Sequence, residues 1–153
     1  MISHRLRDRM VELIRKNLFR SIKYSLSGYL GFFVLEIVTY LGLRLLGYSR
    51  IVEIDAVAFF TGVSLEFLVN EYWTTRNEGF HESSLRGIFI RLGKFQVLNL
   101  LGNIIAISIQ LSLLHFFGIY PLLGNIIGSA MAFPLNYIIQ MKSVWKITLF
   151  LWG

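Results

Sequence analysis

The chain has 153 residues, of which 55% are hydrophobic and only 16% charged, and its formal net charge is +6. About a quarter of the residues of a soluble protein are charged. A soluble domain of this composition would therefore expose large apolar patches, and that class is excluded. Because the chain has no cysteine and its three histidines are scattered, we expect no disulfide, metal site or cofactor.

Residues 1–22 predict an amphipathic cytoplasmic arm. Arginine and lysine side chains alternate there with apolar residues at helical spacing, a pattern typical of a helix that lies in the plane of the lipid headgroups. The apolar positions are Leu6, Met10, Leu13, Ile14 and Leu18.

Four apolar segments follow, each close to the roughly 20 residues that cross a bilayer as a helix. They cover residues 24–46, 54–72, 95–117 and 120–141. Glycine-containing turns at 47–50 and 118–121 join the spans of each pair, and a polar loop at 74–90 separates the pairs. The sequence predicts an all-α integral membrane protein, with four transmembrane helices in a domain over 23–146 and an interfacial tail over 146–153.

The basic residues indicate the orientation of these spans. Thirteen of the fifteen Lys and Arg residues lie in residues 5–23, 76–94 and 142–146, whereas the connection after the first span holds only Arg44 and Arg50. Cytoplasmic segments are enriched in such residues. We expect a multi-pass protein of the cytoplasmic membrane with both termini in the cytoplasm, in contact with membrane lipid and not with nucleic acid.

The two halves of the chain resemble each other at a spacing of 71 residues. Arg20-Ser-Ile-Lys23-Tyr24 matches Arg91-Leu-Gly-Lys94-Phe95, and Leu30-Gly31 matches Leu101-Gly102. With one residue deleted, 66–70 lies over 136–140. The pattern predicts two parallel two-helix repeats, over 20–73 and 91–145, related by an axis along the membrane normal.

Polar side chains within the spans are candidates for a substrate-binding face. Ionisable and amide groups are costly in hydrocarbon and are expected to point inward. Hydrogen bonding between helices explains the amides of the third span equally well, and both interpretations stay open. For Glu66 we favour a function, because bonding between helices rarely needs a carboxylate. The candidates are Glu36, Glu66, Asn70, Asn99, Asn103, Gln110, Asn136 and Gln140.

A second candidate site is the cytoplasmic mouth, defined as Arg20, Lys23, Arg91 and Lys94. Arginine offers a bidentate fork and lysine a point charge to a phosphate or pyrophosphate headgroup. Plain positive-inside topology explains most such residues in most proteins, and recurrence at the same place in both halves adds slight support for a site. The sequence contains no soluble-enzyme motif, and we expect no enzymatic activity.

The chain resembles the GtrA-like family of membrane proteins. The resemblance depends on the motifs at 20–28, 67–74, 91–95 and 136–140 and covers about residues 18–146. It implies a role in moving or presenting polyprenyl-phosphate-linked sugars across the cytoplasmic membrane for cell-surface polysaccharide or glycoprotein synthesis, beside a membrane glycosyltransferase. The sequence departs from the family pattern at Glu71, where a basic residue is usual, and at Gln140.

Two alternatives to a flippase remain at this stage. A non-transporting scaffold could stabilise a membrane complex, and a small proton-coupled cation or drug antiporter also uses four helices and a buried glutamate. Because four helices enclose little volume, we expect a homodimer or a subunit of a larger complex.

Overall fold

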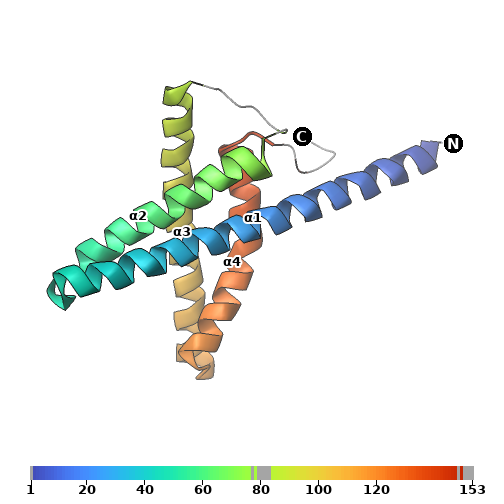
Figure 1. Cartoon of the computed structure of the whole chain (residues 1–153). Helices are drawn as coiled ribbons and strands as arrows, with labels where there is room; N and C mark the ends of the chain where they lie inside the picture. Colours follow the sequence, from blue (N-terminus) through green and yellow to red (C-terminus); the bar gives the residue numbers. More distant parts are fainter. Residues whose placement is uncertain (1, 77, 79–83, 148, 150–153) are drawn as a thin grey trace. The chain divides into compact units, whose positions relative to one another are not determined.

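The computed structural model describes residues 2–76, 78, 84–147 and 149, which form helices and their connections without any β-strand (Figure 1). The all-α prediction is therefore confirmed. The four long helices are α1 (Ile2–Leu46), α2 (Ile51–Val69), α3 (Leu85–Phe117) and α4 (Pro121–Ser143). They form two compact units. The first hairpin holds α1, α2 and the chain from Ile147, and the second covers Ser84–Lys146.

Helix α1 is one continuous helix of 45 residues. The predicted boundary between an arm ending at residue 22 and a separate first span is not a break in this helix. A surface helix that turns into a span needs a kink, usually at proline or glycine, and residues 2–27 contain neither. The N-terminal part of α1 instead extends past the end of α2 in Figure 1.

A short turn connects α1 to α2, as the sequence predicts. Gly47 has φ of 77° and donates its N–H to the Leu43 carbonyl at 3.1 Å. This left-handed conformation favours glycine, and it ends α1 before the 3₁₀ turn η1 (Tyr48–Arg50).

Close backbone contact defines the packing of α1 against α2. A Cβ atom on Gly31 would lie 2.7 Å from the Gly62 carbonyl oxygen, and one on Gly62 would lie 2.6 Å from the Gly31 oxygen. Small residues allow membrane helices to approach this closely. The two glycines therefore fix the distance between α1 and α2.

The end of α2 differs from the prediction. The α-helix stops at Val69 and continues as a π-helical segment, η2 (Asn70–Thr74), instead of as regular helix to residue 72. Segments of this kind are rare and occur often at functional sites. Asn70, Glu71 and Thr74 of η2 are buried.

The second hairpin begins ten residues before the predicted third span. Ser84 caps α3, because its side chain accepts a hydrogen bond from the Gly87 N–H at 3.1 Å. Gly118, with φ of 64°, ends α3, and Pro121 occupies the first turn of α4.

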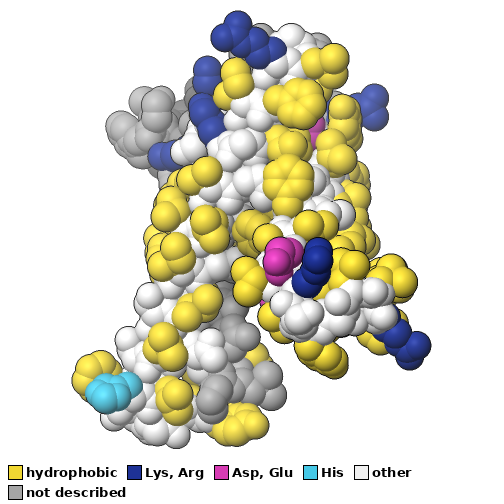
Figure 2. Space-filling model, turned by 90° about the vertical axis from the view of Figure 1, so that its left-hand side faces the viewer, with side chains coloured by type: hydrophobic (Ala, Val, Ile, Leu, Met, Phe, Trp, Pro, Cys, Tyr) yellow, Lys and Arg dark blue, Asp and Glu magenta, His cyan; other side chains and the backbone are white. Residues whose placement is uncertain are grey.

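Large apolar side chains are exposed along all four helices, including Tyr29, Phe33, Phe60 and Phe116. Figure 2 shows hydrophobic side chains over most of the face in view. The segments Met10–Leu46 and Leu85–Phe117 are long and apolar enough to cross a membrane. Such surfaces are unusual in water and suit a lipid environment.

The chain directly after α4 is mostly buried. Trp145 is fully buried and packs edge-on against Phe95, with ring centroids 5.5 Å apart. Ile147 and Leu149 are also buried. The other predicted tail aromatics, Phe150 and Trp152, lie outside the described residues.

Candidate functional site

Polar and charged side chains of the first hairpin gather where α2 ends and the connecting loop begins. We call this group the loop-end site. It comprises Lys16, Asn17, Arg20, Lys23, Ser27, Glu66, Asn70, Thr75 and Glu78.

One face of α1 positions the α1 residues of this site. Arg20, Tyr24, Ser27 and Gly31 are all buried and lie three or four residues apart. At 3.6 residues per turn, this spacing places them on one stripe. The stripe carries a cation, then two hydroxyl-bearing side chains, and then the glycine contact with α2.

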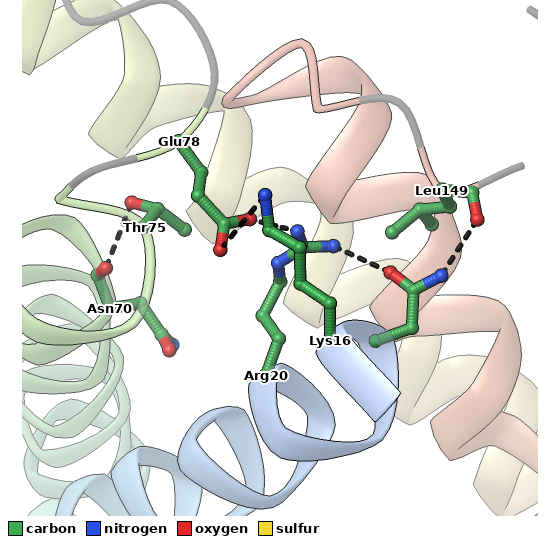
Figure 3. Close-up of polar contacts among 7 residues, drawn as sticks. Lys16, Arg20, Asn70, Thr75, Glu78 and Leu149 are labelled. Atoms are coloured by element: carbon green, nitrogen blue, oxygen red, sulfur yellow. Dashed lines mark hydrogen bonds and ion pairs between the residues drawn. The ribbon is translucent and has the colours of Figure 1, made fainter. Parts of the chain in front are cut away.

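Arg20 is only 4% exposed and is held by side chains on both sides. Its guanidinium donates to Asn17 Oδ1 at 2.7 Å and forms an ion pair with Glu78 (Figure 3). Lys16 lies 3.7 Å from the other Glu78 oxygen. A buried charge is costly unless it is paired, and the Glu78 carboxylate supplies that pairing.

Lys23 lies between two aromatic rings. Its Nζ atom is 5.1 Å from the centre of the Phe19 ring and 5.4 Å from that of Trp73. Both distances allow a cation–π interaction. Phe19 precedes Lys23 by one turn, and Trp73 belongs to η2, so the end of α2 helps to place this lysine.

Asn70 is fully buried at the start of η2. The Ser27 hydroxyl lies 2.7 Å from Asn70 Oδ1 and 2.7 Å from the Tyr24 carbonyl. Thr75 donates its hydroxyl to the Asn70 carbonyl at 2.9 Å, as Figure 3 shows. Among the described residues, Asn70 Nδ2 has no acceptor. The site therefore holds a buried N–H group that a polar ligand could satisfy.

Glu66 lies one turn before Asn70 and is buried against α1. Its Cβ atom would lie 2.9 Å from a Cβ on Gly31, and its Oε1 atom 3.6 Å from one on Gly28. Within the described parts of the chain, Glu66 forms no salt bridge. The glycines of α1 leave room for this carboxyl group between the helices.

The second hairpin presents a matching but neutral arrangement. Asn136 packs against Gly102, where an added Cβ would overlap the Asn136 side-chain amide. Gln140, one turn later, is fully buried. Asn99 donates to the Phe95 carbonyl of its own helix at 3.2 Å, and Gln110 lies beside Gly124.

These contacts follow the predicted repeat. Gly31 matches Gly102 in the sequence, and Glu66 matches Asn136. In the structure each of these glycines contacts the polar residue of its own hairpin. This agreement is additional support for the internal repeat, because the sequence prediction depends on short motifs alone.

Glu36 and Asn103 are exposed in their own hairpins, so their predicted place on an inward polar face stays a prediction. Glu36 follows the buried Gly31 by five residues, which turns it about 140° away from the contact face. Asn103 directly follows the buried Gly102 and points to its flank. Neither side chain belongs to the polar interior of its hairpin.

The four residues of the predicted mouth differ in environment. Arg20 and Arg91 are buried, Lys23 is half-buried and Lys94 is exposed. Arg20 and Lys23 belong to the loop-end site, whereas Arg91 and Lys94 lie at the start of the second hairpin. The prediction that all four bind phosphate stays a prediction.

Sequence reasoning missed Asn17, Thr75 and Glu78. Asn17 lies among the apolar and basic residues of the predicted arm, and Thr75 and Glu78 lie in the loop, where no periodicity indicates a partner. The only signal was the excess of cations beside the loop, which predicts that an acidic residue nearby is paired.

Comparison with known proteins places this geometry in a family. A family model described as GtrA/DPMS, transmembrane domain, matches residues 23–145. The chain is also 30% identical over 126 residues to a dolichol-phosphate mannosyltransferase of Pyrococcus furiosus. That match covers 82% of this chain and 34% of the relative, so the chain spans about a third of the relative's length. The predicted family and the membrane fold are thus confirmed, and this all-α membrane protein belongs to the GtrA/DPMS transmembrane domain family.

Proposed function

We propose that this chain is a membrane translocase, or an accessory subunit, that binds polyprenyl-phosphate-linked sugars for cell-surface glycan or glycoprotein synthesis. Two comparisons support the substrate class. The family model includes the DPMS transmembrane domain, and the relative is named for dolichol phosphate, which is a polyprenyl phosphate. Because the chain matches only about a third of that relative, no covalent step is assigned to this chain.

The observation that carries the proposal is the composition of the loop-end site. A buried arginine and a half-buried lysine lie at the end of the first hairpin. A fully buried amide, whose N–H has no acceptor in the part of the chain that the structure describes, lies further along it. Phosphate oxygens suit the two cations. Sugar hydroxyls suit Ser27, Asn70 and Glu66, because each hydroxyl can both donate and accept.

The exposed apolar surface of the helices provides the place for the isoprenoid chain. Phe19 and Trp73 are largely exposed beside Lys23. An isoprenoid tail in the bilayer can therefore lie against these rings while its phosphate reaches the cations. By the distribution of basic residues, this end of the hairpin faces the cytoplasm.

The test is transbilayer movement of a fluorescent polyprenyl-phosphate sugar in proteoliposomes. We expect wild-type protein to move the lipid and Glu66→Ala or Asn136→Ala to lose most of this activity. Glu53→Gln is the matched control, because Glu53 is an exposed carboxylate in the first turn of α2. Wild-type rates equal to those of empty liposomes would rule out an autonomous translocase.

A second candidate function is that of a membrane anchor for a separate glycosyltransferase. The relative favours it, because two thirds of that mannosyltransferase lies outside the matched region. An anchor should co-purify with its enzyme and should support glycosyl transfer equally well with Glu66→Gln. Loss of lipid movement in that variant, with the complex intact, would favour the translocase.

A further inference from the structure

The Arg20 guanidinium is buried, yet the chain does not use all of its donors. One terminal nitrogen donates to Asn17 and the other pairs with Glu78. The Nε atom has no acceptor within the described residues. Arginine binds an oxyanion most strongly through two parallel hydrogen bonds from its fork. Glu78 thus occupies a site for an oxyanion without using the whole fork.

The cations around Glu78 outnumber it. Lys16, Arg20 and Lys23 lie at i, i+4 and i+7 on α1, which is a single stripe of the helix. Glu78 contacts the first two of them. The loop-end site holds three cations and two carboxylates, Glu66 and Glu78, and so keeps an excess of positive charge, which favours a further anion.

Asn17 fixes the direction of the Arg20 side chain. Its Oδ1 atom accepts from Arg20, and its Nδ2 atom donates to the Leu149 carbonyl at 2.7 Å, as Figure 3 shows. The guanidinium is therefore held by α1 and the C-terminal segment independently of Glu78. A ligand can replace Glu78 without releasing the arginine.

We propose that Glu78 is an internal competitor at the phosphate site, and that the phosphate of the lipid substrate displaces its carboxylate from Arg20. Two phosphate oxygens can engage Nε and the neighbouring terminal nitrogen together, which the observed Glu78 contact does not do. Glu78 thereby excludes anions that bind Arg20 more weakly than its own carboxylate does. This inference depends on the proposed lipid-phosphate function.

The alternative is a purely structural ion pair that ties the loop to α1. The two roles predict opposite effects of removing the charge. A competitor lowers the affinity for phosphate, so its removal tightens binding, whereas a structural tie supports the site, so its removal weakens binding.

The experiment is calorimetric titration of the full chain in nanodiscs with farnesyl phosphate. Glu78→Gln is expected to bind about fivefold more tightly than wild type, the effect of losing one partly exposed ion pair. Glu78→Asp, which keeps the charge but shortens the reach, should fall between the two. Glu53→Gln should equal wild type. Farnesol and inorganic phosphate are titrated in parallel, to separate binding of the lipid from binding of free phosphate.

A double-mutant cycle separates competition at Arg20 from a general change in charge. Arg20→Gln should weaken binding, and Glu78→Gln should give no gain in that background. Thermal unfolding of each variant identifies any that fail to fold, and Glu78→Asp then replaces Glu78→Gln.

The possible failures are distinguishable. If wild type binds farnesyl phosphate but Glu78→Gln binds equally or more weakly, the competitor role is wrong and the proposed function stands. If neither protein binds farnesyl phosphate, both proposals are wrong. An equal gain in affinity from Glu78→Gln in the wild-type and Arg20→Gln backgrounds would also overturn the inference.

Discussion

In the first hairpin the residue packed against the helix-contact glycine is a carboxylic acid, whereas in the second it is an amide. Glu66 contacts Gly31, and Asn136 contacts Gly102 at the matching place. One turn later both hairpins bury an amide, Asn70 or Gln140. The repeated unit therefore preserves a glycine, a polar partner and a buried amide, and it varies the charge of the partner.

The second difference concerns how each hairpin fixes its amide. Ser27 of α1 contacts Asn70, whereas the residue that matches Ser27 in the second half is Leu98. Glu66 and Glu78 also belong to the first hairpin. The two acidic groups and the Ser27 hydroxyl thus all lie in the first hairpin. Recognition of a charged headgroup is therefore expected to depend mainly on the first half of the chain.

The strongest test of the comparison concerns the nature of the helix contact. Gly31→Ala should destabilise the protein by about 2 kcal/mol, because its Cβ would meet the Gly62 backbone oxygen at 2.7 Å and a backbone cannot rotate away. Gly102→Ala should cost clearly less, because its Cβ meets the end of the Asn136 side chain, which can move. Equilibrium unfolding in detergent micelles measures both.

Gly93→Ala is the control for helix propensity. Apart from its chain neighbours and its own helix backbone, no atom of the described residues lies within 4 Å of its Cβ position. We expect this variant to be stabilised by up to about 1 kcal/mol, the difference between alanine and glycine in a helix. Equal losses for Gly31→Ala and Gly102→Ala would show that the two hairpins pack through the same kind of contact.

The long apolar segments were predictable, because a bilayer demands about 20 apolar residues per helix whatever the tertiary contacts are. The first span ends at Leu46, where the sequence placed it, and Gly47 and Gly118 end α1 and α3. The start of α3 was less predictable. Residues 85–94 mix charged and apolar side chains, so hydropathy assigned them partly to the loop, whereas the Ser84 cap starts the helix there.

The candidate site was predictable in residue type but not in pairing. Burial of Glu66 and Asn70 follows from the cost of polar groups in lipid, and the structure confirms it. Glu36 is exposed within its hairpin, which the sequence does not indicate, because a polar residue at one position of a helix does not show which side faces the partner helix. The contact of Glu78 with Arg20 joins residues 58 apart across a loop, and no local pattern encodes it.

A smaller effect is expected at the cross-helix hydroxyl. Ser27→Ala leaves the buried Asn70 amide without its partner and should cost about 1 kcal/mol. Ser25→Ala is the matched control, because among the described residues the Ser25 hydroxyl donates to the Ser21 carbonyl of its own helix and to no other group. If both serine variants lose the same stability, Ser27 does not distinguish the first hairpin from the second.

The smallest effect is expected where Trp73 covers Lys23. Trp73→Leu removes one of the two rings beside the ammonium group, 5.4 Å away, and should cost about 0.5 kcal/mol, as for a partly exposed cation–π pair. Trp73→Phe should retain part of this energy. A double-mutant cycle with Lys23→Gln isolates the interaction.

Lys94, the exposed counterpart in the second hairpin, has no ring over it among the described residues, so Lys94→Gln should change stability by only a few tenths of a kcal/mol. A coupling of zero between Trp73 and Lys23 would mean that the aromatic residues serve the lipid tail alone, and that the cations of the two hairpins are equivalent in this respect.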